Sequence, residues 1–167
     1  FEDIKLVTEE VATSHFIGSI VLMEEEEEDS LGVFTIIDGQ QRVITLTLLL
    51  SSLMFAFKKR NMINHANGTK KYLVAIDTKD VEHAIVAPEN HLSLTRIVEG
   101  VIAISPEDAA AMSAVAFSKS KRASGSKDEL IVKAFQYFSA SFAKMKDEEL
   151  LAFRDAVISV AYVNIKS

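Results

Sequence analysis

Residues 38–42, with the sequence DGQQR, are the part of the chain whose side chains are best suited to chemistry. They lie between GVFTII (residues 32–37) and an almost wholly apolar run over residues 43–57. A turn between two such stretches needs only the Asp-Gly pair. The two glutamines and the arginine are therefore more polar groups than folding requires, and we call residues 38–42 the DGQQR segment.

The flanking patterns predict a strand over 32–37 and a helix from about Gln41 to Arg60, so the DGQQR segment is expected at the start of that helix. The backbone amides of Gln40, Gln41 and Arg42 would then belong to the unpaired first turn, which attracts anions. The planar guanidinium of Arg42 also suits phosphate oxygens. This arrangement predicts phosphate binding.

The other residues of the segment fit the same chemistry. Asp38 would repel a phosphate unless it holds Mg²⁺ or positions a nucleophilic water. Gly39 permits close backbone approach, and Gln40 and Gln41 could orient a base, a sugar or a water. A strand-to-helix turn with a capping Asp38 and a surface Arg42 explains the residues equally well. Because the chain has no Walker A loop and no dinucleotide fingerprint, residue types alone leave both interpretations open.

Length, charge and cysteine content exclude several classes of protein. The 167 residues suit one domain with a real core, and the formal charge of −6 argues against indiscriminate binding of nucleic acid. The absence of cysteine excludes disulfides, Cys-ligated zinc and thiol catalysis. The apolar run over residues 43–57 falls short of the ~20 residues of a membrane span. We expect a cytoplasmic protein, and the start at Phe1 without an initiator Met suggests a fragment of a longer one.

The pattern as a whole predicts a mixed α/β (α+β) chain with a small mixed sheet, a buried central helix and a helical C-terminal half. The expected elements are a helix over 2–13, strands over 15–22, 32–37, 72–76 and 159–165, and helices over 41–60, 105–117, 128–144 and 147–157. Residues 64–71 look like a turn-rich connection, and residues 77–104 show no clean period. Residues 118–127 are expected to be a flexible linker within a single domain over 1–167.

Other charged groups have simpler explanations. Lys58, Lys59 and Arg60 end the predicted central helix, where cations complement the helix dipole, and contact with DNA is the less favoured role. The acidic run over 24–29 lacks the spacing of a calcium loop and is expected to be solvated. The bases of the linker, Lys121 among them, are also expected to be solvated. The four histidines show no metal-ligand spacing.

The chain resembles a known family. FIGSIVL (16–22) followed by IIDGQQRVITLTLLL (36–50) resembles the DGQQR-motif domain of GmrSD-type restriction systems, a ParB/sulfiredoxin-like module. VIAISPEDAAAMSAVAF (101–117), AFQYFSASF (134–142) and ELLAFRDAVISVAYVNI (149–165) are similar to later elements of that family. The resemblance covers nearly the whole chain, and it favours phosphate chemistry over a simple turn.

The resemblance implies a domain that binds and hydrolyses a nucleoside triphosphate with Mg²⁺ in a phage-defence protein. Such proteins restrict modified DNA, and a separate HNH-type nuclease domain often makes the cut. By position in the motif, Asp38 and Gln41 are the implied catalytic residues, and Asp38 is the implied Mg²⁺ ligand. The implied nucleotide-binding residues are Gly18, Ser19, Asp38, Gly39, Gln40, Gln41 and Arg42.

Two alternatives remain beside the NTPase hypothesis. The domain could sense a nucleotide or modified DNA without turnover and regulate a partner nuclease. It could also be the nuclease itself, which is disfavoured because one aspartate does not make a two-metal site. The family usually has further segments before Phe1 and after Ser167, so we expect weak binding or no hydrolysis by the fragment if those segments complete the site.

Overall fold

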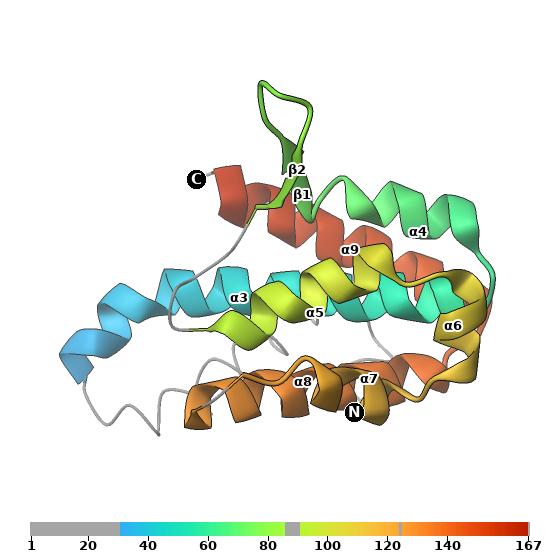
Figure 1. Cartoon of the computed structure of the whole chain (residues 1–167). Helices are drawn as coiled ribbons and strands as arrows, with labels where there is room; N and C mark the ends of the chain where they lie inside the picture. The colour runs from blue at the N-terminus through green and yellow to red at the C-terminus, as the bar shows by residue number, and fades with distance from the viewer. Residues whose placement is uncertain (1–30, 86–90, 124, 167) are drawn as a thin grey trace. The chain divides into compact units, whose positions relative to one another are not determined.

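The computed structural model describes residues 31–85, 91–123 and 125–166, and helices dominate them (Figure 1). In chain order the described elements are helices α3 (Leu31–Lys59) and α4 (Ile63–Lys70), strands β1 (Val74–Ile76) and β2 (Glu82–Ala84), and helices α5 (Leu92–Ala103), α6 (Pro106–Ala111), α7 (Ala114–Ser120), α8 (Ser126–Ala143) and α9 (Asp147–Lys166). The predicted helix over 2–13 and the predicted strand over 15–22 lie outside the described residues.

Backbone packing divides the chain into two compact units, which are described separately here. Of the described residues, 31–46 and 145–166 belong to one unit and 47–144 to the other. Helix α3 contributes residues to both. The expectation of a single domain over 1–167 stays a prediction.

The sheet of the described chain is a two-stranded antiparallel hairpin, which is compatible with the expected mixed α/β class. Strand β1 falls within the strand predicted over 72–76, and it pairs with β2 in a register that sets Val74 opposite Ala84 and Ile76 opposite Glu82. A sheet of the ParB/sulfiredoxin-like type stays a prediction.

Two of the predicted strands are helical instead. Residues 32–37 lie within α3, and residues 159–165 lie within α9. Both stretches are rich in β-branched residues, but such propensities are weak priors that tertiary context overrides. Each stretch adjoins a helix that is already formed, and extending a helix is far easier than nucleating one. In α9, the buried residues Leu150, Phe153 and Val157 follow helical spacing.

Two helices were not expected. Helix α4 replaces the turn-rich connection predicted over 64–71, although its Asn and Gly residues are poor helix formers. Its buried residues are Ala66 and Thr69, and the Thr69 hydroxyl donates to the carbonyl of His65 at 2.8 Å. Helix α5 occupies part of residues 77–104, where no clean period was recognised.

The buried stripe of α5 does follow a helical period. Leu94, Ile97, Val98 and Val101 are all fully buried, at positions i, i+3, i+4 and i+7. The pattern was obscured because the residues before it, which include strand β2 and its turn, follow no helical period. A shorter window placed on α5 alone would have found this helix.

The helix predicted over 105–117 is divided into α6 and α7. The predicted start is confirmed, because the Ser105 hydroxyl accepts from the amide of Asp108 at 3.1 Å and Pro106 occupies the first turn. The chain becomes extended at Met112, and Ser113 then caps α7 by accepting from the amide of Ala116 at 3.0 Å. A second serine with N-cap geometry therefore restarts the helix.

The segment 118–127 is not a free linker at its described residues. Residues 118–120 belong to α7, and α8 begins at Ser126. Between the two helices, the amide of Ala123 donates to the Ser93 hydroxyl at 2.7 Å, and Arg96 donates to the carbonyl of Arg122 at 3.2 Å. Two contacts with α5 thus hold this polar, basic stretch in place.

The core of the unit formed by residues 47–144 is aromatic. Phe55 of α3, Phe117 of α7 and Phe135 of α8 contact one another, with ring centroids 4.8 to 5.8 Å apart. At such distances the partly positive edge of one ring attracts the partly negative face of another, and this attraction stabilises the core in addition to the burial of apolar surface. The spacing of apolar residues over 128–144 predicts a buried side formed by Leu130, Ala134, Phe135, Phe138 and Phe142. The three phenylalanines are fully buried, whereas Leu130 and Ala134 are only half-buried.

The hairpin turn is organised by the carboxylate of Asp77. The amides of Lys79 and Val81 donate to Oδ1 at 2.8 and 3.0 Å, and Nε2 of His83 lies 2.7 Å from Oδ2. The turn extends away from α4 and α5 (Figure 1). The hydrogen bond from Val81, followed by those from His83 and Lys79, lowers the pKa of the Asp77 carboxyl.

Helix α5 has its N-terminus bound by a residue distant in sequence. The carboxylate of Asp128, in the first turn of α8, accepts from the amide of Ser93 at 3.0 Å. Asp128 is 5% exposed although it is charged. His91, at the N-cap position of α5, makes no side-chain capping bond, so Asp128 takes that role from another helix.

Lowering the pH should loosen the hairpin turn. Because folding depresses the pKa of Asp77, its stabilising effect is present above the pKa of the unfolded chain and is lost as the pH falls through the folded-state pKa. In an NMR titration, the amide shifts of Lys79 and Val81 should change together with the Asp77 carboxyl carbon. The midpoint should lie below that of the same carboxyl in urea, and Asp77→Asn should abolish the transition; equal midpoints would contradict the prediction.

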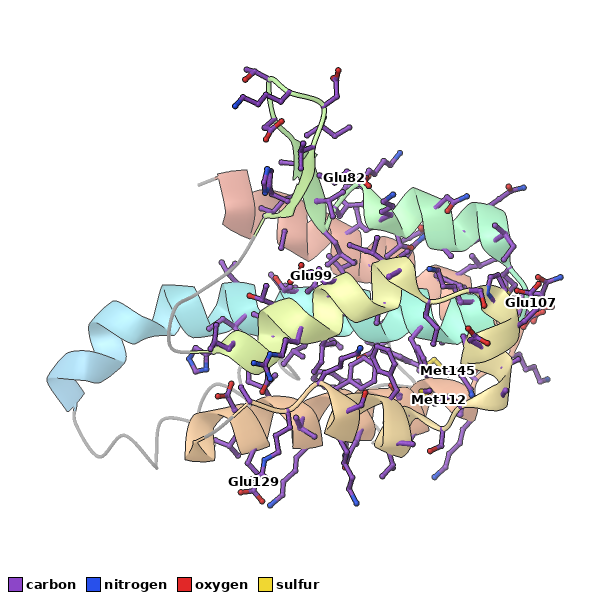
Figure 2. The ribbon with its side chains drawn as sticks, viewed as in Figure 1. Glu82, Glu99, Glu107, Met112, Glu129 and Met145 are labelled. Atoms are coloured by element: carbon purple, nitrogen blue, oxygen red, sulfur yellow. The ribbon has the colours of Figure 1, made fainter. Side chains whose placement is uncertain are left out.

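Replacing Asp128 with Ala should lower the free energy of unfolding by about 1 to 2 kcal/mol, because the buried amide of Ser93 loses its acceptor. Asp128→Asn keeps an oxygen acceptor and should lose less. Glu129→Ala is the matched control, since the Glu129 side chain points away from α8 on its outer side (Figure 2) and forms an exposed ion pair with Lys133. Urea unfolding of the three variants checks the order, and equal losses for Asp128→Ala and Glu129→Ala would contradict it.

Candidate functional site

The DGQQR segment lies inside helix α3 and not at its start. The helix begins at Leu31, about two helical turns before Asp38. The predicted boundary near Gln41 is therefore wrong. In an uninterrupted helix the amides of Gln40, Gln41 and Arg42 are interior positions, so they are not the unpaired first-turn donors that were expected.

Helical spacing gives the segment a different arrangement. Positions 38, 41 and 42 are related as i, i+3 and i+4, so they share one face of α3. That face carries an aspartate, a glutamine and an arginine. A carboxylate and a guanidinium on one helical face are a combination able to bind a metal ion and a phosphate of one ligand. The implied partners Gly18 and Ser19 lie outside the described residues.

The segment is followed by the most continuously buried part of the described chain. Every residue from Ile44 to Lys58 is buried. The polar side chains within this stretch have local partners: the hydroxyls of Ser51 and Ser52 donate to the carbonyls of Thr47 and Leu48, each at 2.8 Å. The DGQQR segment thus directly precedes this buried stretch within the same helix.

The C-terminal end of α3 carries a cation that binds another helix. The ammonium of Lys58 donates to the carbonyls of Val101, Ile102 and Ile104 at 2.7, 2.9 and 2.7 Å. These carbonyls belong to the last turn of α5 and the residue that ends it. Lys58 therefore caps a helix more than forty residues further along the chain.

The next two residues act in the same way. The ammonium of Lys59 donates to the carbonyls of Ala109 and Met112 at 3.0 and 2.6 Å, at the end of α6. Arg60 donates through Nη2 to the carbonyl of Phe142 at 2.8 Å, at the end of α8. Three consecutive cations thus bind the negative ends of three different helices. Each of these cations already has a carbonyl partner, which favours the structural role over contact with DNA.

Burial has a measurable consequence for Lys58. Its side chain is 8% exposed. Loss of solvation lowers the pKa of its ammonium below the usual value, and the nearby charge of Lys70 lowers it further. Because the unfolded chain holds this proton more tightly, the contribution of Lys58 to stability rises as the pH increases through its folded-state pKa.

Among the side chains that the structure describes, no three His, Cys, Asp or Glu residues group closely enough to hold a metal ion. None of the described helices is both long enough and apolar enough to cross a membrane.

Comparison with known proteins places the chain among the proteins of restriction systems. The family model described as GmrSD restriction endonuclease, N-terminal domain, matches residues 1–166, and the chain belongs to this family. The comparisons found no match among curated proteins and none among solved structures. The match confirms the resemblance to GmrSD-type systems, whereas the ParB-like affiliation and the role of the DGQQR segment stay predictions.

Replacing Lys58 with Met keeps most of the side-chain volume but removes all three hydrogen bonds. We expect the free energy of unfolding to fall by about 2 kcal/mol, because the carbonyls at the end of α5 lose a charged donor. Lys133→Met is the control, since Lys133 is exposed and pairs only with Glu129 at 3.5 Å; its effect should stay within about 0.5 kcal/mol. Urea unfolding at neutral pH measures both, and a Lys58→Met variant as stable as the control would contradict the capping role.

Proposed function

We propose that this chain binds a nucleoside triphosphate with Mg²⁺ and hydrolyses it, as part of a phage-defence restriction system that acts on modified DNA. Family membership supports the restriction role. The observation that carries the nucleotide proposal is the common face of positions 38, 41 and 42 on α3. These positions lie just before the buried stretch of the same helix.

The residues of this face have complementary roles in the proposal. Arg42 binds phosphate oxygens through its planar fork. Asp38 holds Mg²⁺ or positions the attacking water, and Gln41 orients that water. The bound nucleotide with Mg²⁺ supplies the phosphoryl group that is transferred to water. The remaining proposed nucleotide contacts are Gly18, Ser19, Gly39 and Gln40.

The proposal extends to the setting of the domain. We place it in the cytoplasm, where hydrolysis would regulate or power an HNH-type nuclease domain of the full-length protein. A module that senses a nucleotide or modified DNA without turnover is the alternative, and it differs only in the fate of the bound nucleotide. Binding and turnover are therefore measured separately.

Calorimetric titration of the chain with ATP, GTP, CTP and UTP in the presence of Mg²⁺ tests binding. At least one triphosphate should bind, and Arg42→Ala should weaken it by about 10- to 100-fold, because a charged hydrogen-bond partner of the phosphate is lost. Lys133→Ala, which removes an exposed cation of α8, should bind as the unaltered chain does. Failure of all four triphosphates to bind, or binding insensitive to Arg42→Ala, would overturn the proposal.

Replacing Asp38 with Asn separates hydrolysis from sensing. If the chain hydrolyses the nucleotide, Asp38→Asn should lower phosphate release by about 10²- to 10⁴-fold and still bind the triphosphate, because the carboxylate acts on water or metal. Release of inorganic phosphate over time measures this. A chain that binds the triphosphate but releases no phosphate would exclude hydrolysis by this domain alone and favour the sensing module.

A further inference from the structure

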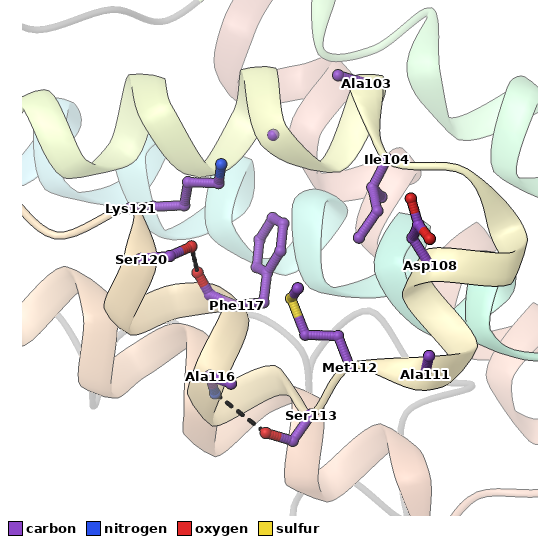
Figure 3. Close-up of a pocket in the computed structure, with 11 residues that line it drawn as sticks. Ala103, Ile104, Asp108, Ala111, Met112, Ser113, Ala116, Phe117, Ser120 and Lys121 are labelled. Carbon is purple, nitrogen blue, oxygen red and sulfur yellow. Dashed lines mark hydrogen bonds between the residues drawn. The ribbon is translucent and has the colours of Figure 1, made fainter.

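A pocket that none of the predicted site residues touches opens among α5, α6 and α7 (Figure 3). Its volume of about 770 Å³ falls within the range of small-molecule sites. Its lining is mostly apolar, with two charged groups and two hydroxyls. The lining residues are Gly100, Ala103, Ile104, Asp108, Ala111, Met112, Ser113, Ala116, Phe117, Ser120 and Lys121.

The apolar part of the pocket is held by the core. The ring of Phe117 lies 4.8 Å from that of Phe55 and 5.6 Å from that of Phe135, so its position is fixed from behind. Ile104 and Met112 stand beside it in Figure 3. Met112 remains 37% exposed at the rim, and its flexible thioether can adapt to a planar group.

Glycine at position 100 brings a cation into the pocket. A Cβ at this position would lie 2.6 Å from Cε of Lys121 and 3.1 Å from Cζ of Phe117. Because Gly100 has no side chain, Lys121 can lie across α5 with its ammonium 5.5 Å from the centre of the Phe117 ring. Lys121 is half-buried, and it contacts α5 and the Phe117 ring in addition to the solvent expected for it.

The two charged groups of the pocket are available to a ligand. None of the ion pairs between described residues includes Lys121 or Asp108. They stand at opposite ends of the pocket, with Phe117 and Met112 between them (Figure 3). The hydroxyls are already engaged, since Ser113 caps α7 and Ser120 donates to the carbonyl of Phe117 at 2.6 Å.

We propose that this pocket binds a small planar aromatic anion that carries a hydrogen-bond donor at the end remote from its charge. The anionic group pairs with Lys121, the ring packs against Phe117 and Met112, and the donor binds the carboxylate of Asp108. Repulsion by Asp108 fixes this orientation. Amino-substituted aromatic carboxylates and nucleoside monophosphates with an amino-bearing base share this chemistry. The site is separate from the DGQQR segment and does not depend on it.

Titration of the chain followed by two-dimensional NMR tests the proposal with matched pairs of probes. The pairs are 4-aminobenzoate with benzoate, and adenosine monophosphate with purine riboside monophosphate, and they distinguish the two sources. The amino-bearing member of at least one pair should bind about 10-fold more tightly than its partner, with the largest shifts at residues that line the pocket.

Five variants locate the binding. Lys121→Met, which keeps the stem over Gly100, should weaken the amino-bearing probe by about 10-fold, and Asp108→Ala should remove the preference for it. Lys119→Met on the same helix and Glu107→Ala in the same first turn of α6 are the controls and should change nothing. Gly100→Ala favours the helix but displaces Lys121, so it should weaken binding in a folded protein.

Three results would overturn the proposal: no binding of any probe at millimolar concentration, equal binding within both pairs, or binding unchanged by Lys121→Met. Binding abolished by Arg42→Ala and unaffected by Lys121→Met would place the ligand at the DGQQR segment. That result would exclude this pocket and support the proposed nucleotide site, so the two proposals fail independently.

Discussion

The arrangement of residues 47–144 depends on the ammonium of Lys58 and its three carbonyl partners at the end of α5. Helix ends leave carbonyls without intrahelical partners, and such groups are costly to bury unless something donates to them. Lys59 and Arg60 repeat the solution for α6 and α8. The last two residues of α3 and the residue after it thus donate to the ends of three helices, while Asp128 binds the opposite end of α5. At these helix ends, charged residues distant in sequence replace local capping residues.

The capping role of these cations affects which charged side chains are candidates for binding a ligand. Because the basic residues at the C-terminal end of α3 donate hydrogen bonds to carbonyls, they are poor candidates for binding the phosphate backbone of DNA. The two proposed ligand sites use other charges: those at positions 38 and 42 of α3, and the pair Lys121 and Asp108 of the pocket. Membership of the GmrSD N-terminal family makes the domain part of a restriction system. The same helix therefore combines a structural end with a proposed nucleotide site.

The residues of the candidate site were proposed from the sequence and stay a prediction, whereas the backbone expected around them was wrong. The DGQQR segment stands out in the sequence because its polar groups exceed what a turn needs. Its expected position at a helix mouth relied on a strand over 32–37, and that stretch is helical in α3. β-Branched residues favour strands only where neighbouring strands accept them, which a local sequence pattern does not specify. The pocket was missed because its lining comes from three helices whose packing no local pattern reveals.

The sequence by itself determined the elements whose causes are local. The apolar run of α3, the phenylalanine spacing of α8 and the Ser105 cap of α6 each act within a few residues. Only the tertiary structure decided the rest: the helical state of 159–165, the two contacts that hold the segment between α7 and α8, and the partners of Lys58, Lys59 and Arg60. Those partners lie more than forty residues away. Contacts between residues so far apart in sequence form only when the helices pack together. Their energies therefore depend on the fold, and no periodic pattern in the sequence reveals them.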